Sequence, residues 1–406
     1  MLVLCIGQAG IQVGQHCKTR LDAQKRHHMM VFVDTERKTL DKLPFSSTRS
    51  KFDHRQICMG SLGRGNNWAA GFSCDEWLLE ELETIVREMR AVEGTGSGLG
   101  SRLTAELRSL YPKKCIISYV VAPFASGDTS LQSYNSLISL SYALECSDAI
   151  ALFPNDELFS NVARLRQDRT RSEPKNVSDL SLVNNQIAQC LTELVNPLYD
   201  SLARPSSSYT SFNAYDFVGK MIPLPTCKFI QLKTVSTSSS SKFLQDSIVE
   251  SLQPRSHSLA AYVVARGQPS CMQEWHDRLA PRLESVLNKG GSMILPFTFS
   301  VGLERDTSYT FAENSPVHTV PYLTTLIERT TRLWDSGAFL HWYKSFRSKQ
   351  FCFIERTVVF AMAVYAKLIR RTPGSLGFLR HLDASTEMIQ TTVDMKNKGT
   401  IPPNSS

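Results

Sequence analysis

The sequence predicts an α/β protein: a doubly wound, mostly parallel sheet joined by a core helix to a smaller α+β domain and C-terminal helices. Short apolar runs alternate with amphipathic stretches up to about residue 155, which is typical of strands and helices that alternate along a parallel sheet. The chain has 406 residues, more than one hydrophobic core usually serves, so further domains are expected.

Elements in the first part of the chain follow from hydrophobic periodicity. Apolar runs of strand length end on glycine or acidic residues, and apolar residues spaced three or four apart indicate amphipathic helices. Strands are predicted at residues 2–6, 31–33 and 115–121, and helices at 77–89 and 99–110, the latter with a stripe of Leu99, Leu103, Leu107 and Leu110.

The same criteria divide the rest of the chain. A helix is predicted at 180–195, strands at 227–232, 259–264 and 293–299, and final helices at 322–334 and 361–370. The predicted units are a first α/β domain at 1–176, a core helix at 177–200, an intermediate α+β domain at 201–320 and a C-terminal helical region at 321–406.

Composition favours a soluble, cytosolic protein. Ten cysteines are scattered without a CxxC pair or a Cys/His cluster at metal spacing, which indicates a reducing compartment and argues against structural zinc. Neither a signal peptide nor an apolar stretch long enough for a membrane is apparent. The basic segments at 18–28 and 164–175 lack interleaved aromatic residues, so we expect neither nucleic acid nor membrane as a partner.

The sequence EGTGSGLGS at 93–101 is the clearest candidate binding element. Its alternating glycines permit positive φ and a close approach of backbone N–H groups, and a predicted helix follows, so phosphate is the natural ligand. The run lacks the GK[ST] ending of a P-loop and does not fit the GxGxxG dinucleotide pattern. A purely structural turn is the alternative for the run taken alone.

Five loops at predicted strand ends together resemble those of one family. They are GQAGIQVGQ at 7–15, VFVDTE at 31–36, GNNWAAG at 65–71, GTGSGLG at 94–100 and DTSLQSYN at 128–135. In this order they resemble the nucleotide loops of tubulins, and AFLHWY at 338–343 is similar to that family's C-terminal helix. Within the family, residues 133–156 most resemble delta-tubulin. The resemblance implies a tubulin-like fold that starts with a GTPase domain.

The resemblance also implies that the chain binds GTP with Mg²⁺. Asn66 would reach the γ-phosphate, Asp128 would lie beside the ribose, and Asn155 would contact the guanine edge. The complete set of implied contacts is Gly7, Gln8, Gln12, Asn66, Gly94, Thr95, Gly96, Ser97, Gly98, Asp128, Gln132 and Asn155. Asp34 and Glu36 would hold Mg²⁺ through water, as hard oxygen ligands do. A cap or turn role is the alternative for each residue taken singly.

Three segments depart from the tubulin pattern, one of which is the segment between Gln15 and Val31, far shorter than is usual in tubulins. The helix predicted at 77–89 runs directly into the glycine run, so a central strand before Gly94 is apparently missing. Ladder groups left unpaired by that loss would cost about 1–3 kcal/mol each. Residues 344–372 resemble an insertion within the C-terminal region.

Single positions depart as well. Gln132 stands where tubulins have a ribose-binding glutamate, and Val177 and Ser181 replace residues that stack on the base and hydrogen-bond it. Together with the missing strand, these changes predict weak GTP binding and reduced guanine selectivity.

Hydrolysis in tubulins is completed by an acidic residue of the next subunit. The spacing of Asp216 to Pro223 fits that role, in which a carboxylate orients the attacking water. A helix-capping role for Asp216, next to Phe217, is the alternative. The chain is therefore expected to be a GTPase at most, with hydrolysis that depends on assembly.

The resemblance implies a GTP-binding cytoskeletal protein of the delta-tubulin type. It would act with other tubulins or centriolar microtubule proteins in the cytoplasm, at the cytoskeleton and at the centriole or basal body, in triplet microtubules and cilium assembly, with the nucleus left open as a location. A non-polymerising tubulin-like scaffold with an impaired nucleotide site is the alternative, favoured by Gln132 and Ser181. A dinucleotide-dependent oxidoreductase is disfavoured, because Asp34 could bind a ribose but no catalytic donor accompanies it.

Overall fold

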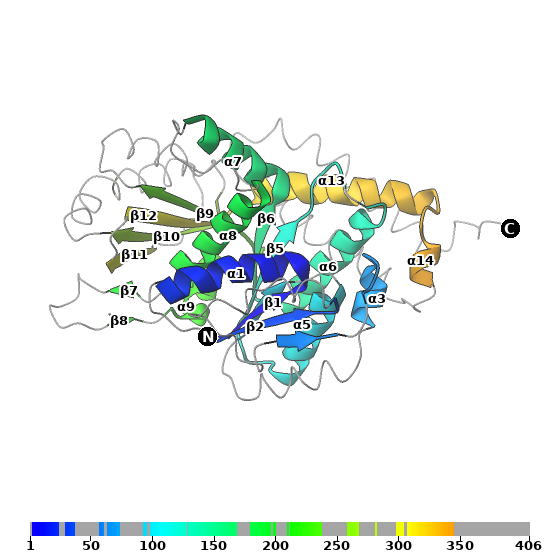
Figure 1. The fold of residues 1–406 in the computed structure, drawn as a ribbon, viewed down its shortest axis with the longest axis horizontal. Helices are drawn as coiled ribbons and strands as arrows, with labels where there is room; N and C mark the ends of the chain where they lie inside the picture. The colour runs from blue at the N-terminus through cyan, green and yellow to red at the C-terminus, as the bar shows by residue number, and fades with distance from the viewer. Residues whose placement is uncertain are drawn as a thin grey trace.

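A computed structural model gives the fold of the chain. It describes residues 2–23, 29–36, 57–60, 63–73, 92–95, 98–127, 129–168, 179–195, 198–199, 209–210, 212–237, 258–267, 281, 298–303 and 307–344. These residues form one large sheet with helices on both faces (Figure 1).

Six parallel strands make the N-terminal part of the sheet. In spatial order they are β3 (Ile57–Met59), β2 (Met29–Asp34), β1 (Leu2–Ile6), β4 (Val92–Thr95), β5 (Ile116–Ala122) and β6 (Ala149–Pro154). The order 3-2-1-4-5-6 is that of a doubly wound sheet, in which the chain runs outward from the centre in both directions. The predicted fold class and the strands predicted at 2–6, 31–33 and 115–121 are confirmed.

β4 occupies the central position where the sequence suggested that a strand is missing. Residues 94–95 pair with residues 4–5 of β1, and residues 92–93 pair with residues 116–117 of β5. The expectation of a sheet without this strand is therefore corrected, because the start of the glycine run itself forms a short strand. The physical reason is that the backbone groups of β1 and β5 need hydrogen-bond partners on this side.

The sheet continues through a second, mixed part. Beyond β6 the order is β9 (Phe229–Thr237), β12 (Thr307–Asn314), β10 (Ala260–Gly267) and β11 (Thr298–Leu303). β9 is parallel to β6 and antiparallel to β12. β7 (Leu198–Tyr199) and β8 (Tyr209–Thr210) form a separate antiparallel pair. Because one sheet runs through both parts, the domain boundaries at 176, 200 and 320 stay predictions.

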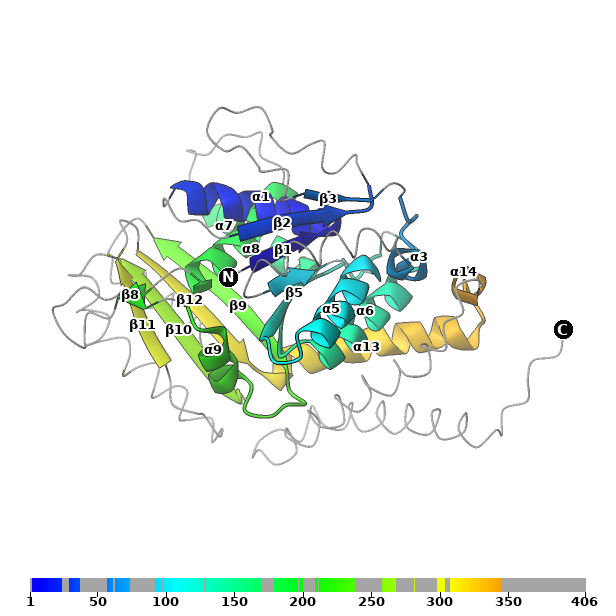
Figure 2. The same cartoon turned by 90° about the horizontal axis from the view of Figure 1, so that it is seen from below.

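Helices cover both faces of the parallel strands (Figure 2). One face carries α1 (Gly7–Ala23), α7 (Asn155–Asp168) and α8 (Asp179–Val195), and the other carries α3 (Trp68–Phe72), α5 (Gly98–Leu110), α6 (Gln132–Cys146) and α13 (Pro316–Asp335). α9 (Ala214–Met221) packs on the mixed strands, and α14 (His341–Lys344) follows α13. No helix among the described ranges is long and apolar enough to span a bilayer.

The described helices agree with the periodicity of the sequence. α5, α8 and α13 confirm the helices predicted at 99–110, 180–195 and 322–334. The helices predicted at 77–89 and 361–370, most of the strand at 293–299, and the insertion at 344–372 beyond its first residue lie outside the described residues.

α5 shows how its sequence determines one buried face. Leu99, Leu103 and Leu107 are buried against β1 and its neighbours, at spacings of four residues that keep them on one side of the helix. The fourth residue of the predicted stripe, Leu110, is instead 45% exposed, because the helix ends there, just before Pro112.

A buried ion network ties α8 to the mixed strands. The Arg266 guanidinium of β10 is fully buried and donates to the backbone carbonyl of Glu193 through Nε at 2.9 Å and Nη2 at 2.6 Å. Its Nε also lies 2.9 Å from Glu193 Oε2, while Arg20 of α1 lies 3.4 Å from Oε1. A cation at the C-terminal end of a helix is favourable for the helix dipole. Three elements from both parts of the sheet therefore meet at one carboxylate.

Gly98 is a glycine because α3 crosses the start of α5 at close range. A Cβ at this position would lie 2.0 Å from the carbonyl oxygen of Trp68 and 2.8 Å from the amide nitrogen of Phe72. Both are backbone atoms, so neither can rotate away. The first turn of α5 therefore lies as close to α3 as backbone contact allows.

We predict that Gly98→Ala lowers the free energy of unfolding by about 1–3 kcal/mol, because overpacking forces the two helices apart. Gly219→Ala is the matched control, since Gly219 lies in α9 and a Cβ added there would have no other atom within 4 Å. That control should raise stability by about 0.5–1 kcal/mol through helix propensity. Urea unfolding of both variants measures the effect, and equal stability of the two would refute the packing argument.

Candidate functional site

The main cleft lies where the doubly wound sheet changes direction. β1 leads into α1 on one face, while α5, which follows β4, packs on the other, so the two connections diverge between neighbouring strands. Ligands of such sheets bind beyond the carboxyl ends of the strands at this point. A cleft of about 520 Å³ lies here, within the range of roughly 300–1,000 Å³ for small-ligand sites.

The cleft brings together predicted contacts from loops that are far apart in sequence. Its walls include the start of α1, the end of β2, the loop before α3, the first turn of α5 and one side of α6. The predicted residues that line it are Gly7, Gln8, Asp34, Glu36, Asn66, Gly98 and Gln132.

Two helix N-termini supply anion-binding groups to this cleft. α1 begins at Gly7, whose φ of 70° is strained for any residue with a Cβ, and α5 begins at Gly98. The first turn of neither helix contains an acidic residue. The first backbone N–H groups of a helix lack intrahelical acceptors and carry a partial positive charge. The pair is suited to phosphate groups.

The loop before α3 approaches the same cleft. Asn66 has a left-handed backbone with φ of 54°, and the Asn67 side chain caps α3 by accepting a hydrogen bond from the Ala69 amide at 2.9 Å. Asn135 of α6 also lines the cleft and donates from Nδ2 to the carbonyl oxygen of Asn66 at 2.7 Å. The sequence interpretation missed Asn135, although it closes the quoted motif DTSLQSYN.

The predicted metal ligands lie at the end of β2. Asp34 is 8% exposed and its Oδ1 accepts from the Glu36 amide at 3.3 Å, while the Glu36 side chain is exposed at the cleft. Within the described ranges no three His, Cys, Asp or Glu side chains cluster around one point. Mg²⁺ commonly uses one or two carboxylates with water and phosphate oxygens, so these two residues fit it as partners of a bound phosphate rather than as a complete cage.

Gln12, predicted to contact the ligand, does not line the cleft. Its Oε1 accepts a hydrogen bond from Asn184 Nδ2 of α8 at 3.1 Å. One turn further along α1, His16 Nε2 lies 3.4 Å from the hydroxyl of Ser181. Burial, and secondarily Arg20, lower the pKa of His16, which favours the neutral ring. The sequence interpretation missed Asn184. Because it lies three residues after Ser181, the two residues are on the same face of one helix, and this spacing could have indicated that Asn184 also faces α1.

Asn155 also lies outside the cleft lining, at the first position of α7. Its side-chain Oδ1 is buried and has no hydrogen-bond partner among the described residues. A buried amide oxygen without a donor costs about 1–3 kcal/mol. A ligand N–H at this point would remove that cost, so the residue fits a hydrogen-bonding role toward a base.

Gln132 lines the cleft but its amide is already engaged. Nε2 donates to the carbonyl oxygen of Phe124 at 2.6 Å. A glutamate at this position, as the tubulin resemblance implies, could not make this bond at neutral pH because a carboxylate has no N–H. The side chain therefore holds the loop after β5.

The remaining predicted contacts are only partly described. Gly94 and Thr95 belong to β4, so their backbones pair with β1. Gly96, Ser97 and Asp128, like Val177, lie outside the described residues.

Asp216 lies on α9 and does not line the cleft. Its side chain is exposed and forms an ion pair with Lys220 at 2.8 Å. The cap of α9 is Asn213, whose Oδ1 accepts from the amides of Tyr215 and Asp216. The capping alternative for Asp216 is therefore wrong, while its role toward a neighbouring subunit stays a prediction.

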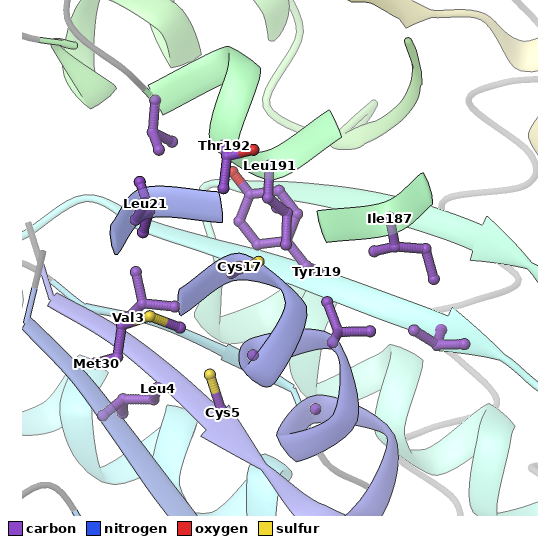
Figure 3. Close-up of a pocket in the computed structure, with 15 residues that line it drawn as sticks. Val3, Leu4, Cys5, Cys17, Leu21, Met30, Tyr119, Ile187, Leu191 and Thr192 are labelled. Atoms are coloured by element: carbon purple, nitrogen blue, oxygen red, sulfur yellow. The ribbon is translucent and has the colours of Figure 1, made fainter. Parts of the chain in front are cut away.

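A second, smaller cavity of about 50 Å³ lies between α1, α8 and the strands beneath them (Figure 3). The Tyr119 ring of β5 reaches toward Leu191 and Thr192 of α8, and the surrounding side chains are mostly apolar. The Thr192 hydroxyl is bonded to the Ala188 carbonyl at 2.9 Å. This void lacks the polar groups that a nucleotide requires.

Comparison with known proteins identifies a related family for the part of the chain that forms most of the cleft. The family model for the Tubulin/FtsZ family, GTPase domain, matches residues 1–163. Residues 1–163 therefore resemble the GTPase domain of that family, and the resemblance noted in the loops is confirmed.

Individual relatives include delta and gamma tubulin chains. The tubulin delta chain of Homo sapiens is 26% identical over 243 residues, covering 54% of this chain and 51% of that protein. The tubulin delta chain of Mus musculus is 28% identical over 224 residues, covering 50% and 47%. The tubulin gamma chain of Saccharomyces cerevisiae is 29% identical over 226 residues, covering 52% and 44%. The matches thus span about half the length of these relatives.

We predict that Asp34→Asn reduces the dependence of nucleotide binding on Mg²⁺. The asparagine keeps the oxygen that accepts from Glu36 but loses the negative charge that favours a metal. Wild-type affinity for GTP should fall about ten-fold or more when EDTA replaces Mg²⁺, a difference that corresponds to about 1.4 kcal/mol. The variant should show a much smaller difference. Asp22→Asn, which removes a half-buried carboxylate paired with Lys18 outside the cleft lining, is the control.

Proposed function

We propose that this chain binds a guanine nucleotide with Mg²⁺ in the cleft beyond the carboxyl ends of β1 and β4, and that it acts as a tubulin-type protein that assembles with other tubulins. The observation that supports this most is that the N-termini of α1 and α5 and the carboxylate of Asp34 meet at one cleft. Backbone donors favour phosphate oxygens, and a carboxylate opposite them favours a bridging Mg²⁺.

Guanine selectivity depends on residues outside the cleft lining. The Oδ1 of Asn155 has no hydrogen-bond partner among the described residues and is suited to accept an N–H of the base. Guanine and adenine carry their N–H groups at different ring positions, so such a bond can distinguish them. Gln12 lies outside that lining, and its Oε1 already accepts from Asn184, so only its Nε2 donor is left for a base. The short β4 removes one reason to expect weak binding, whereas the altered base contacts remain a reason to expect modest selectivity for guanine.

The finer proposal is a delta-tubulin type of role at the centriole or basal body, in triplet microtubules and cilium assembly. It is supported by the similarity to tubulin delta chains, which covers about half of their length. Localisation of the tagged full chain in ciliated cells tests it, and a uniform cytoplasmic signal would argue against it.

A non-polymerising scaffold is the second candidate. It is favoured by two hydrogen bonds within the protein, from Gln132 Nε2 to Phe124 and from Asn184 to Gln12 Oε1, which leave fewer groups for the ligand. Sedimentation with purified tubulin distinguishes the two candidates: nucleotide-dependent co-sedimentation supports assembly, and nucleotide-independent binding supports the scaffold.

Hydrolysis, if it accompanies assembly, would use the exposed Asp216 of a neighbouring copy.

We predict that Gln8→Glu abolishes most nucleotide binding without weakening the fold. Gln8 is exposed in the first turn of α1, where an added negative charge interacts favourably with the helix dipole and stabilises the helix. The same charge repels a triphosphate, so GTP affinity should fall at least ten-fold. Fluorescence titration with a labelled GTP, with ATP as competitor, measures both affinity and selectivity.

The matched control is Gln15→Glu, the same change two turns later on α1 and outside the cleft lining. It should bind GTP as the wild type does. Failure of the wild type to bind GTP would contradict the proposed function, and equal losses in the two variants would contradict the location of the site.

A further inference from the structure

The side-chain amide of Asn135 joins three separate segments. Its Oδ1 accepts from the Trp68 amide of α3 at 2.9 Å and from the Tyr343 hydroxyl of α14 at 2.6 Å. Its Nδ2 donates to the carbonyl oxygen of Asn66 at 2.7 Å. A single residue of α6 therefore connects the loop at the cleft with the far C-terminal part of the described chain.

Chemistry fixes the orientation of this amide. The backbone N–H of Trp68 needs an acceptor and the carbonyl of Asn66 needs a donor, so a flipped amide would oppose like groups at both places. Tyr343 is 2% exposed, and burial raises its pKa, so its hydroxyl stays protonated and donates to Asn135.

The segment 338–343, here named the C-terminal turn, is fastened to the same region by further contacts. The Tyr134 hydroxyl donates to the carbonyl oxygen of Ala338 at 3.0 Å, and the Tyr134 and Tyr343 rings meet edge to face with centroids 5.5 Å apart. Asn67 Nδ2 donates to the carbonyl oxygen of Trp342 at 3.1 Å. The C-terminal turn thus touches both the loop before α3 and the helix that holds that loop.

Asn66 needs such support because of its backbone. The left-handed region is uncommon for residues with a Cβ, and although asparagine tolerates it better than most, neighbouring contacts help to hold it there. The bond from Asn135 to the Asn66 carbonyl is a direct constraint on that conformation.

We infer that Asn135 is a positioning residue for the nucleotide, which holds Asn66 toward the γ-phosphate and couples that phosphate to the C-terminal turn through Tyr343. The inference rests on the proposed function and extends it from binding to discrimination between GTP and GDP. Coupling is reciprocal, so if the C-terminal turn favours GTP, then GTP must stabilise the C-terminal turn by the same free energy.

Tyr343→Phe tests this with the smallest possible change. It removes the hydroxyl donor to Asn135 and keeps the buried ring and its packing on Tyr134. Loss of one neutral hydrogen bond of this kind corresponds to roughly a two- to ten-fold effect. We expect GTP affinity to fall about three-fold or more relative to GDP affinity, while GDP affinity stays within about two-fold.

Tyr134→Phe is the matched control. It removes another tyrosine hydroxyl bond to the same C-terminal turn, from Tyr134 to the Ala338 carbonyl, but leaves the bond from Tyr343 to Asn135 in place. Its ratio of GTP to GDP affinity should match the wild type. Equal changes in both variants would overturn the inference, because the C-terminal turn would then act only through general stability.

Amide hydrogen exchange over residues 338–343 gives a second measurement. If Tyr343 only stabilised the fold, the difference in exchange rate between the GTP-bound and GDP-bound protein would not change in the variant. Exchange should be slower with GTP than with GDP in the wild type, and Tyr343→Phe should abolish that difference. A wild type that binds neither nucleotide would overturn the proposed function together with this inference. A wild type that binds both, with an unchanged ratio in Tyr343→Phe, would overturn this inference alone.

Discussion

A four-residue strand at the centre of the sheet determines where the cleft can form. β4 pairs with β1 on one side and with β5 on the other, and without it those strands would face each other with unpaired backbone groups. It also sets the point at which α1 and α5 diverge to opposite faces. The carboxyl ends of β1 and β4 lie side by side, and the N-termini of both helices border one cleft, only because this strand is in place.

Contacts between helices fix the positions of the segments that line the cleft. Gly98 lets α3 lie against the start of α5, and the Trp68 indole donates to Ser101 at 3.1 Å across the same contact. On the opposite face, Glu193 and Arg266 join α8 to the mixed strands. The helix N-termini proposed to bind phosphate are therefore held in place by close backbone packing between α3 and α5. On the other face, α8 is the element that connects the helices near the cleft with the mixed strands.

The sequence predicted the fold class and several of the described elements, such as β1, α5 and α8, because their apolar residues repeat at strand or helix spacing. The resemblance of the loops to those of tubulins also pointed to cleft residues such as Gly7, Asp34 and Asn66, which line one cleft in the structure. The sequence interpretation was wrong about the missing strand, since glycine-rich residues have low strand propensity and only the unpaired neighbours explain their pairing. Asn135 and Asn184 depend on contacts between distant segments, which periodicity does not contain.

The most direct test of this account is amide hydrogen exchange over residues 92–95 in the purified, nucleotide-free chain. If the strand completes the sheet, these amides should exchange slowly, with protection similar to that of residues 2–6 in β1. Exchange at the rate of an unstructured peptide would contradict the account, because the sheet would then be open at the position from which the whole cleft is built.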